Sequence, residues 1–339
     1  GGDVTGFVSV DNFETTEFSN YESLVIAAGA GSDVTNLNNP VTPAALADIT
    51  VESGDDTAGD TVIVNGTDAA DTLAYSPNDI TAAGVTGAGP VPVNVTGTEG
   101  LRINGQGGDD ELTVNATSGS DTIVHTPGAA PDEGSFQLVL AGFGDTPAAV
   151  AYTDLGLGGS VVISSGGGDD TLVALGTSAS DLIEVAANGD VTLNSLAGAH
   201  VKLSPDGSDV ENLVLDGEGA NAFTLAAGYP YDSVRVNGGG WDDMAELTGD
   251  GSTITVNPMT SPVRVSGGGL GEVQLSGIAF IDVQAGAADV EVAGTAAEDF
   301  LAATITPSVS VIGLTAGAEW VSVSWSSSAP SLSVDLMGG

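Results

Sequence analysis

A glycine–aspartate block that recurs along the chain is the feature that most limits how this sequence can fold. It reads TEGLRINGQGGDDELTV at 98–114 and GGSVVISSGGGDDTLVA at 158–174, and weaker copies begin at residues 21, 210 and 278. A second block occurs as GTDAADTL at 66–73, ATSGSDTI at 116–123, GTSASDLI at 176–183 and GTAAEDFL at 294–301. Repeats of this length indicate units that stack, because one such unit cannot bury its apolar side alone.

The residues around these blocks are typical of short strands and tight turns. Strands rich in β-branched residues are predicted at 60–64, 111–114, 160–163, 233–236 and 272–275, with alternating polar and apolar residues at 321–325 and 332–336. Only 43–49, PAALADI, with Thr42 as its N-cap, is predicted to form a short helix. We therefore expect an all-β fold of stacked repeats. A parallel β-solenoid is the first choice, and a string of β-sandwich domains is the alternative.

The repeats also predict how the chain is organised. We expect an N-terminal β segment or cap with a first degenerate repeat at 1–50, a β-repeat array at 51–302, and a C-terminal β cap or docking segment at 303–339. The two ends differ from the array because the outermost units of a stack must present a polar face or a cap.

The charge of the chain excludes several classes of protein. It has 46 acidic and 4 basic side chains, which give a formal net charge of -42. Nucleic-acid binding through basic patches is excluded, and docking on anionic lipid is disfavoured. The chain has no cysteine, so disulfides and thiolate metal sites are excluded. Apolar residues make up 41%, which suffices for a core, and no apolar run is long enough for a membrane helix.

Paired aspartates at the glycine turns are the candidate metal ligands. Calcium takes six to eight oxygen ligands, and a glycine-rich turn exposes carbonyls beside the carboxylates. Stacked pairs would form a column of carboxylates about 4.8 Å apart, which repel unless cations lie between them. The alternative is that the aspartates cap solvated turns. The candidate residues are Asp55, Asp56, Asp109, Asp110, Asp121, Asp169, Asp170, Asp181, Asp242 and Asp243.

The turn sequence resembles the calcium-binding haemolysin-type (RTX) repeat G-G-x-G-x-D-x-U-x. Gly168, Asp170 and Leu172 match its fourth, sixth and eighth positions, as do Gly108, Asp110 and Leu112, whereas the copy at 238–247 has Trp241 in place of a glycine. This resemblance implies bound calcium, although the motif occurs singly here and not in tandem. Nearly the whole chain also resembles large, acidic, cysteine-free bacterial surface proteins of the adhesin, surface-layer and extracellular filament type. That resemblance implies an extracellular or cell-surface location.

Catalytic arrangements are not indicated. The basic residues Arg102, Lys202, Arg235 and Arg264 are scattered, and we expect Arg102 and Arg235 to pair with nearby aspartates. His125 and His200 lack a partner motif, and no G-x-S-x-G sequence occurs. We predict a non-catalytic structural protein that associates with itself into a homopolymer or lattice. The alternatives are a calcium-dependent adhesin module that binds cell-surface glycans and a β-helix enzyme that degrades polysaccharides. Asn65, Asn94 and Asn115 begin glycosylation sequons, and each would be a surface site if the cell glycosylates its exterior proteins.

Overall fold

The fold was analysed in a computed structural model. It describes residues 4–10, 15–38, 41–54, 59–79, 82–142, 147–207, 209–239, 242–258, 260–286, 288–293, 300–305, 309–316, 319–326 and 332–335. For Asp79, Ala293 and the strands from Phe300 on, only the backbone is described. The chain divides into two compact units, Gly1–Gly168 and Asp169–Gly339. The described residues form strands, turns and irregular segments without an α-helix, so none of their elements is a helix that could cross a membrane.

The described residues of the first unit form fifteen strands. They are β1 (Gly6–Ser9), β2 (Thr15–Phe18), β3 (Ser23–Ala27), β4 (Val34–Asn38), β5 (Asp48–Glu52), β6 (Thr61–Asn65), β7 (Thr72–Asp79), β8 (Ala82–Thr86), β9 (Val93–Thr96), β10 (Gly100–Asn104), β11 (Glu111–Asn115), β12 (Thr122–Pro127), β13 (Gly134–Val139), β14 (Ala149–Thr153) and β15 (Ser160–Ser164).

The second unit continues in the same manner. Its strands are β16 (Thr171–Leu175), β17 (Leu182–Val185), β18 (Val191–Ser195), β19 (Gly198–Ala199), β20 (Lys202–Pro205), β21 (Asn212–Asp216), β22 (Ala222–Ala226), β23 (Ser233–Asn237), β24 (Met244–Thr248), β25 (Ile254–Asn257), β26 (Val263–Gly267), β27 (Glu272–Ser276), β28 (Phe280–Gln284), β29 (Val290–Ala293), β30 (Phe300–Ile305), β31 (Val309–Ala316), β32 (Glu319–Ser326) and β33 (Leu332–Asp335).

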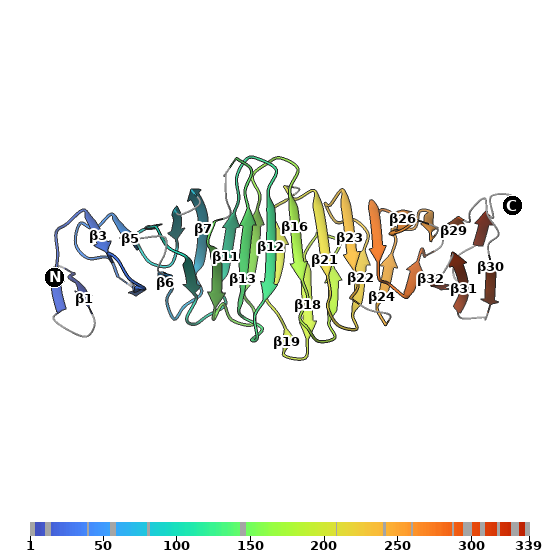
Figure 1. Cartoon of the computed structure of the whole chain (residues 1–339), viewed down its shortest axis with the longest axis horizontal. Helices are drawn as coiled ribbons and strands as arrows, with labels where there is room; N and C mark the ends of the chain where they lie inside the picture. Colours follow the sequence, from blue (N-terminus) through green and yellow to red (C-terminus); the bar gives the residue numbers. More distant parts are fainter. Residues whose placement is uncertain are drawn as a thin grey trace. The chain divides into compact units, whose positions relative to one another are not determined.

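Within each unit the chain crosses repeatedly between two sheets, so that strands of successive coils lie side by side (Figure 1). In the first unit, β6, β10 and β14 pair in parallel in one sheet, and β7, β11 and β15 pair in parallel in the other. Side chains alternate between core and solvent: Leu112 and Val114 of β11 are buried, whereas Glu111 lies outside. The core is therefore the layer between the two sheets. This stacked arrangement confirms the predicted all-β, solenoid-like fold.

Antiparallel triplets interrupt this simple coil. Strand β12 is followed by the antiparallel strands β13 and β14 in the same sheet, and β14 pairs with β10, the preceding strand of that sheet. The triplet β25, β26 and β27 does the same, because β27 pairs with β23 while β25 pairs with the later strand β29. The chain thus enters each of these triplets at the strand farthest from the preceding coil, and it leaves from the strand that pairs with that coil. A triplet adds two strands to one sheet and none to the other.

The predicted strands at 60–64, 111–114, 160–163, 233–236 and 272–275 are confirmed as β6, β11, β15, β23 and β27. The predicted helix at 43–49 is wrong. Residues 44–45 form a turn, with φ of 69° at Ala45, and strand β5 begins at Asp48. Pairing of β5 with β3 and β9 overrides the local helix propensity of this alanine-rich segment. The expected domain limits after residues 50 and 302 fall inside β5 and β30.

Candidate functional site

The corners that join consecutive strands carry most of the predicted aspartates. At the corners that begin with glycine, a side chain at that glycine would meet the last residue of the same corner. A Cβ atom at Gly105 would overlap the Asp110 carboxylate and the Asp154 carbonyl, and one at Gly66 would lie 2.6 Å from Asp71 Oδ2. The carboxylate at the end of the corner therefore occupies the space that a side chain at the first position would need, and only glycine leaves that space free. The same relation joins Gly176 to Asp181, Gly217 to Asn221 and Gly238 to Asp243.

The Gly-Gly portion of the corner lets neighbouring coils approach closely. Gly108 has a φ of 102°, a backbone angle that residues other than glycine rarely adopt. A Cβ atom there would lie 2.6 Å from the backbone nitrogen of Ala70, in the corner of the preceding coil. Glycine at this position is thus required both by conformation and by the stacking of one corner on the next.

The buried carboxylates join one coil to the next. Asp110 is 1% exposed, and its Oδ1 accepts the backbone N–H of Asp71 at 2.8 Å. Asp60 Oδ1 likewise accepts the N–H of Asp33 at 2.8 Å. In each case the last residue of a corner accepts from the residue at the same position one coil earlier. We call this arrangement the corner ladder. In the second unit, Asn221 Oδ1 accepts from Asp181 N at 3.0 Å, and Asp243 Oδ1 accepts from Asn221 N at 2.6 Å.

In the pairs Asp109–Asp110 and Asp169–Asp170, the first aspartate faces solvent and accepts a hydrogen bond from the coil that follows. Asp109 Oδ1 accepts the N–H of Gly158 at 2.9 Å, in the corner that follows. Asp169 Oδ1 accepts from the amide of Asn212 at 2.7 Å. In the pair Asp109–Asp110, the first carboxylate therefore holds the next coil and the second holds the previous one.

The Gly-Thr-x-x-x-Asp blocks close their own turns. Asp71 Oδ2 accepts the N–H of Thr67 at 2.6 Å, and Asp181 Oδ2 accepts that of Thr177 at 2.6 Å. In the third case, Asp121 Oδ2 accepts both N–H and hydroxyl of Thr117 at 2.7 Å. The threonine hydroxyl then accepts the N–H two residues later, at Ala69, Gly119 and Ala179. This local ring explains why threonine and aspartate recur four residues apart.

Burial and nearby charge raise the pKa of Asp110. The largest cause is loss of hydration, and the charges of Asp71 and Asp109 add to it, while the hydrogen bond from the backbone of Asp71 opposes it. Asp110 Oδ2 is buried without a hydrogen-bond donor among the described residues, as is Asp60 Oδ2. The raised pKa means that the Asp110 carboxyl favours its neutral form more than a solvated aspartate does.

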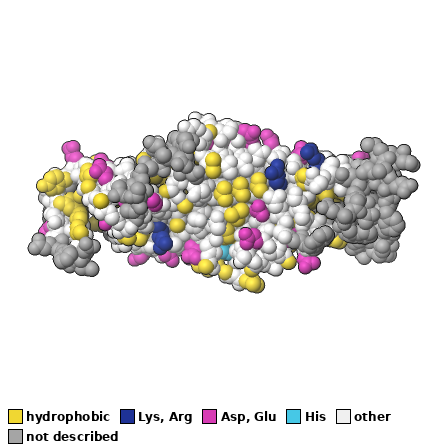
Figure 2. Space-filling model, viewed as in Figure 1, with side chains coloured by type: hydrophobic (Ala, Val, Ile, Leu, Met, Phe, Trp, Pro, Cys, Tyr) yellow, Lys and Arg dark blue, Asp and Glu magenta, His cyan; other side chains and the backbone are white. Residues whose placement is uncertain are grey.

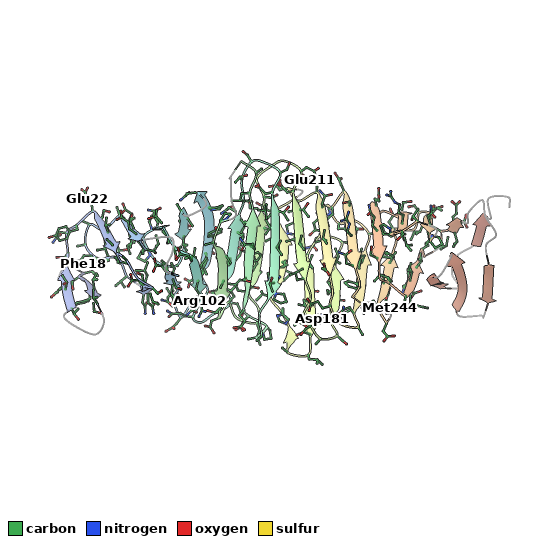
Figure 3. The ribbon with its side chains drawn as sticks, viewed as in Figure 1. Phe18, Glu22, Arg102, Asp181, Glu211 and Met244 are labelled. Atoms are coloured by element: carbon green, nitrogen blue, oxygen red, sulfur yellow. The ribbon has the colours of Figure 1, made fainter. Side chains whose placement is uncertain are left out.

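The predicted Asp pairs do not form one column. The corner at 105–110 lies against 66–71 and 154–159, whereas Gly166 and Gly168 lie against Thr117 and Gly119. In the second unit, Figure 3 places Asp181 and Glu211 at opposite ends of the strands. Glu211 Oε2 accepts the N–H of Asp170 at 2.8 Å, so this corner ladder runs along the other edge from that of Asp181.

Metal binding at these residues stays a prediction. Among the described residues, no group of three or more His, Asp and Glu side chains is placed to hold a metal ion. Asp110, Asp121, Asp170, Asp181 and Asp243 are buried, and Asp109, Asp169 and Asp242 are exposed. Asp55, Asp56 and Trp241 lie outside the described residues.

The basic residues correct another expectation. The ion pairs found in the described part of the chain are Lys202 with Asp190 at 2.8 Å and Arg264 with Glu272 at 3.0 Å. Arg102 and Arg235 are exposed on their strands, and no ion pair joins either to a carboxylate among the described residues. Their cross-strand neighbours carry no charge: Ile63 and Ala151 for Arg102, and Val214 and Gln274 for Arg235. Figure 2 shows Asp and Glu side chains scattered over the visible face.

Two further groups of polar residues are structural. His125 Nε2 lies 2.8 Å from the Tyr152 hydroxyl inside the core, and His200 Nε2 lies 2.8 Å from Ser195 Oγ. Of the sequon residues, Asn94 is exposed, but Asn65 is buried and donates to the Leu37 carbonyl at 2.7 Å. The expectation that Asn65 lies at the surface is therefore wrong, because its amide links neighbouring strands.

Comparison with known proteins adds no family. No family model matches the chain, and no curated protein is significantly similar to it. The resemblance to acidic bacterial surface proteins and to haemolysin-type repeats stays an expectation from the motifs.

Proposed function

We propose that this chain is a non-catalytic structural protein of the cell exterior, a segment of a surface layer, filament or adhesin stalk. The observation that carries the proposal is the corner ladder. In other proteins, carboxylates serve in catalysis or ligand binding. Here corner carboxylates accept hydrogen bonds from backbone N–H groups of the adjoining coil, as Asp110 does from Asp71. Acidic residues at the corners thus stabilise the contact between coils.

The parallel strand ladders support a mechanical role. Within a unit, a coil is hydrogen-bonded to the coil before and the coil after it, as β10 is to β6 and β14. Bending such a stack requires these bonds to stretch together, which makes the material stiff. The net charge of -42 keeps the outer surface hydrated and resists non-specific contact.

Self-association is the partner interaction that we propose. A stack of coils has two open ends, and unpaired strand edges are templates for further pairing. A homopolymer or lattice would satisfy these edges. We propose calcium as an accessory ion at the exposed corner aspartates, not as a catalytic cofactor.

Electron microscopy and analytical ultracentrifugation of the purified chain test the proposal. We expect ordered filaments or lattices, or a concentration-dependent increase in mass, in salt that screens the negative charge. A strictly monomeric species at high protein concentration, with and without calcium, would contradict it. Release of reducing ends from acidic polysaccharides would contradict the non-catalytic assignment.

A further inference from the structure

The N-terminal end of the first unit leaves two strands with an unpaired side. Among the described strands, β3 pairs with β5 and β4 pairs with β6, and the hairpin β1–β2 forms a sheet of its own. Thr61 N donates to Asp33 O, and Val34 is opposite Thr61. Backbone groups alternate in direction along a strand, so Asp33 and Thr35 face β6, while Val34 and Asn36 face the unpaired side.

The core is only partly covered at the same end. Leu24 and Ile26 of β3 are only half-buried, although their partners Ile49 and Val51 in β5 are 4% and 0% exposed. Apolar side chains gather there, as Figure 2 shows over the end that holds β1 and β3. We call these exposed residues the N-terminal apolar end. They are Val4, Phe7, Tyr21, Val25, Val34 and Val41, with exposures from 44% to 70%.

The corner ladder is also incomplete at this end. Asp60 Oδ1 accepts the N–H of the preceding corner, and its Oδ2 is buried without a donor. Asp33 is the first member of this ladder, and its Oδ2 is likewise buried without a donor. No described residue donates to its Oδ1. The Asp33 carboxylate is thus arranged like that of Asp60, but the coil that would supply an N–H is missing.

We propose that the N-terminal apolar end binds the last coil of a second copy of this chain, so that copies join head to tail. This inference rests on the proposed self-association and assigns it a site. The occupant must bring a parallel strand with an unpaired edge and a backbone N–H opposite Asp33. The C-terminal strand β33 has such an edge, since it pairs in parallel with β29 and ends its sheet.

Charge does not select this partner, because both copies are acidic. Attraction must come from apolar contact and backbone hydrogen bonds, opposed by the repulsion between two chains of net charge -42. Head-to-tail association is therefore expected to strengthen with salt. In about 1 M sodium chloride the Debye length falls to about 3 Å, which removes most of the repulsion.

Sedimentation velocity of the full chain in high salt tests the site with two double variants of equal charge. Val25→Lys with Val34→Lys places cations on the unpaired edge, and Leu157→Lys with Leu196→Lys places them at residues that are 77% and 89% exposed elsewhere. We expect the first to weaken association by about tenfold or more, and the second to leave it unchanged. Both should melt like the wild type.

A second pair of variants tests the incomplete ladder. Asp33→Ala removes the acceptor, whereas Asp33→Asn keeps an Oδ1 that can accept an N–H. Association should weaken in the alanine variant and persist in the asparagine variant, with unchanged melting of the monomer in both. Asp33 remains testable even if the lysine variants fail to fold.

The outcomes separate the two proposals. If the wild type associates and all four variants associate equally well, the N-terminal site is wrong and self-association stands. If the wild type stays monomeric in high salt at every concentration, self-association fails and the site fails with it. Equal weakening by the Leu157 and Leu196 variant would also overturn the site, because the effect would then follow charge and not position.

Discussion

The corners at 105–110 and 116–121 follow one another in the first unit and use the same residue in different ways. Both end in a buried aspartate directly before a strand. Asp110 accepts from Asp71 in the neighbouring coil, whereas Asp121 accepts from Thr117 in its own corner and from Ala141 N, beyond β13, at 2.6 Å. The Asp110 carboxylate thus accepts from the neighbouring coil, and the Asp121 carboxylate accepts from its own turn and from the adjoining triplet. Aspartate at this position is thus a general acceptor, and its neighbours decide the donor.

Removing Asp121 should have the largest effect on stability. Asp121→Ala leaves the partly buried N–H groups of Thr117 and Ala141 without this acceptor. An unsatisfied buried group costs about 1–3 kcal/mol, and water can reach these two in part, so we expect a loss of about 2–4 kcal/mol in the free energy of unfolding. Urea unfolding monitored by circular dichroism measures it. Asp121→Asn should recover part of the loss, because it retains one acceptor oxygen. A loss equal to that of an exposed Asp→Ala change would contradict this account.

Gly105→Ala should rank next, because it tests the fit between the first and last residues of the corner. The new methyl group would overlap the Asp110 carboxylate and the Asp154 carbonyl. Overpacking of this kind costs about 1–3 kcal/mol. The reciprocal change Ala116→Gly, at the start of the other corner, serves as the control and should cost at most about 1 kcal/mol. Similar losses for the two changes in urea unfolding would show that the corners do not differ in this respect.

Titration of Asp110 should also make the free energy of unfolding depend on pH. Its pKa is raised in the folded state, chiefly by burial, so folding favours the protonated form. The stability associated with that proton is present below the unfolded pKa of about 3.9 and is lost as pH rises through the folded pKa. Asp110→Asn keeps the acceptor for Asp71 N without this titration, as Asn221 does naturally for Asp181 N.

Urea unfolding from pH 3 to 7 measures the difference between wild type and Asp110→Asn. We expect the asparagine variant to gain stability relative to the wild type as pH rises, and the two to converge at the acid end. Asp206→Asn, at an exposed position whose charge is not among the causes of the Asp110 shift, is the control. A gap between wild type and Asp110→Asn that does not change with pH would rule out titration of Asp110 in this range.

The strands and their stacking could be predicted from the sequence, because β-branched alternation and glycine turns are local signals. The arrangement of the repeats could not. From β10 to the next repeat at β15, the chain crosses between the sheets three times: to β11, to the triplet β12–β14, and to β15. The repeat that begins at β15 also contains three crossings. Those that begin at β3 and β21 contain five. The longer spacings to the next copy, from residue 21 to 98 and from 210 to 278, belong to the repeats with five crossings.

An odd number of crossings sends equivalent corners to alternate edges of the stack. This is why the corner of Asp110 lies against 66–71, while the corner that begins at Ser165 lies against 116–121. Sequence spacing reveals that corners recur, but the edge on which each lies depends on the number of crossings between them. The predicted single column of Asp pairs assumed an even number. The roles of Asp110 and Asp170 were likewise hidden, because their partners are distant in sequence. Asp71 N, which donates to the Asp110 carboxylate, is 39 residues away, and Glu211, which accepts from Asp170 N, is 41 residues away.

Calcium should have the smallest effect of those considered. Because equivalent corners alternate between the two edges of the stack, exposed carboxylates such as Asp109 and Asp169 are separated from one another. A ligand that binds only the folded state at ten times its Kd stabilises by about 1.4 kcal/mol. We expect millimolar calcium to raise the Tm slightly above its value in chelator. Asp109→Asn with Asp169→Asn should abolish that difference without lowering the Tm in chelator. Asp169→Ala with Asp170→Ala is a poorer test, because loss of the buried Asp170 destabilises the chain with or without calcium. Identical melting of the wild type in calcium and in chelator would leave the corner aspartates with structural roles alone.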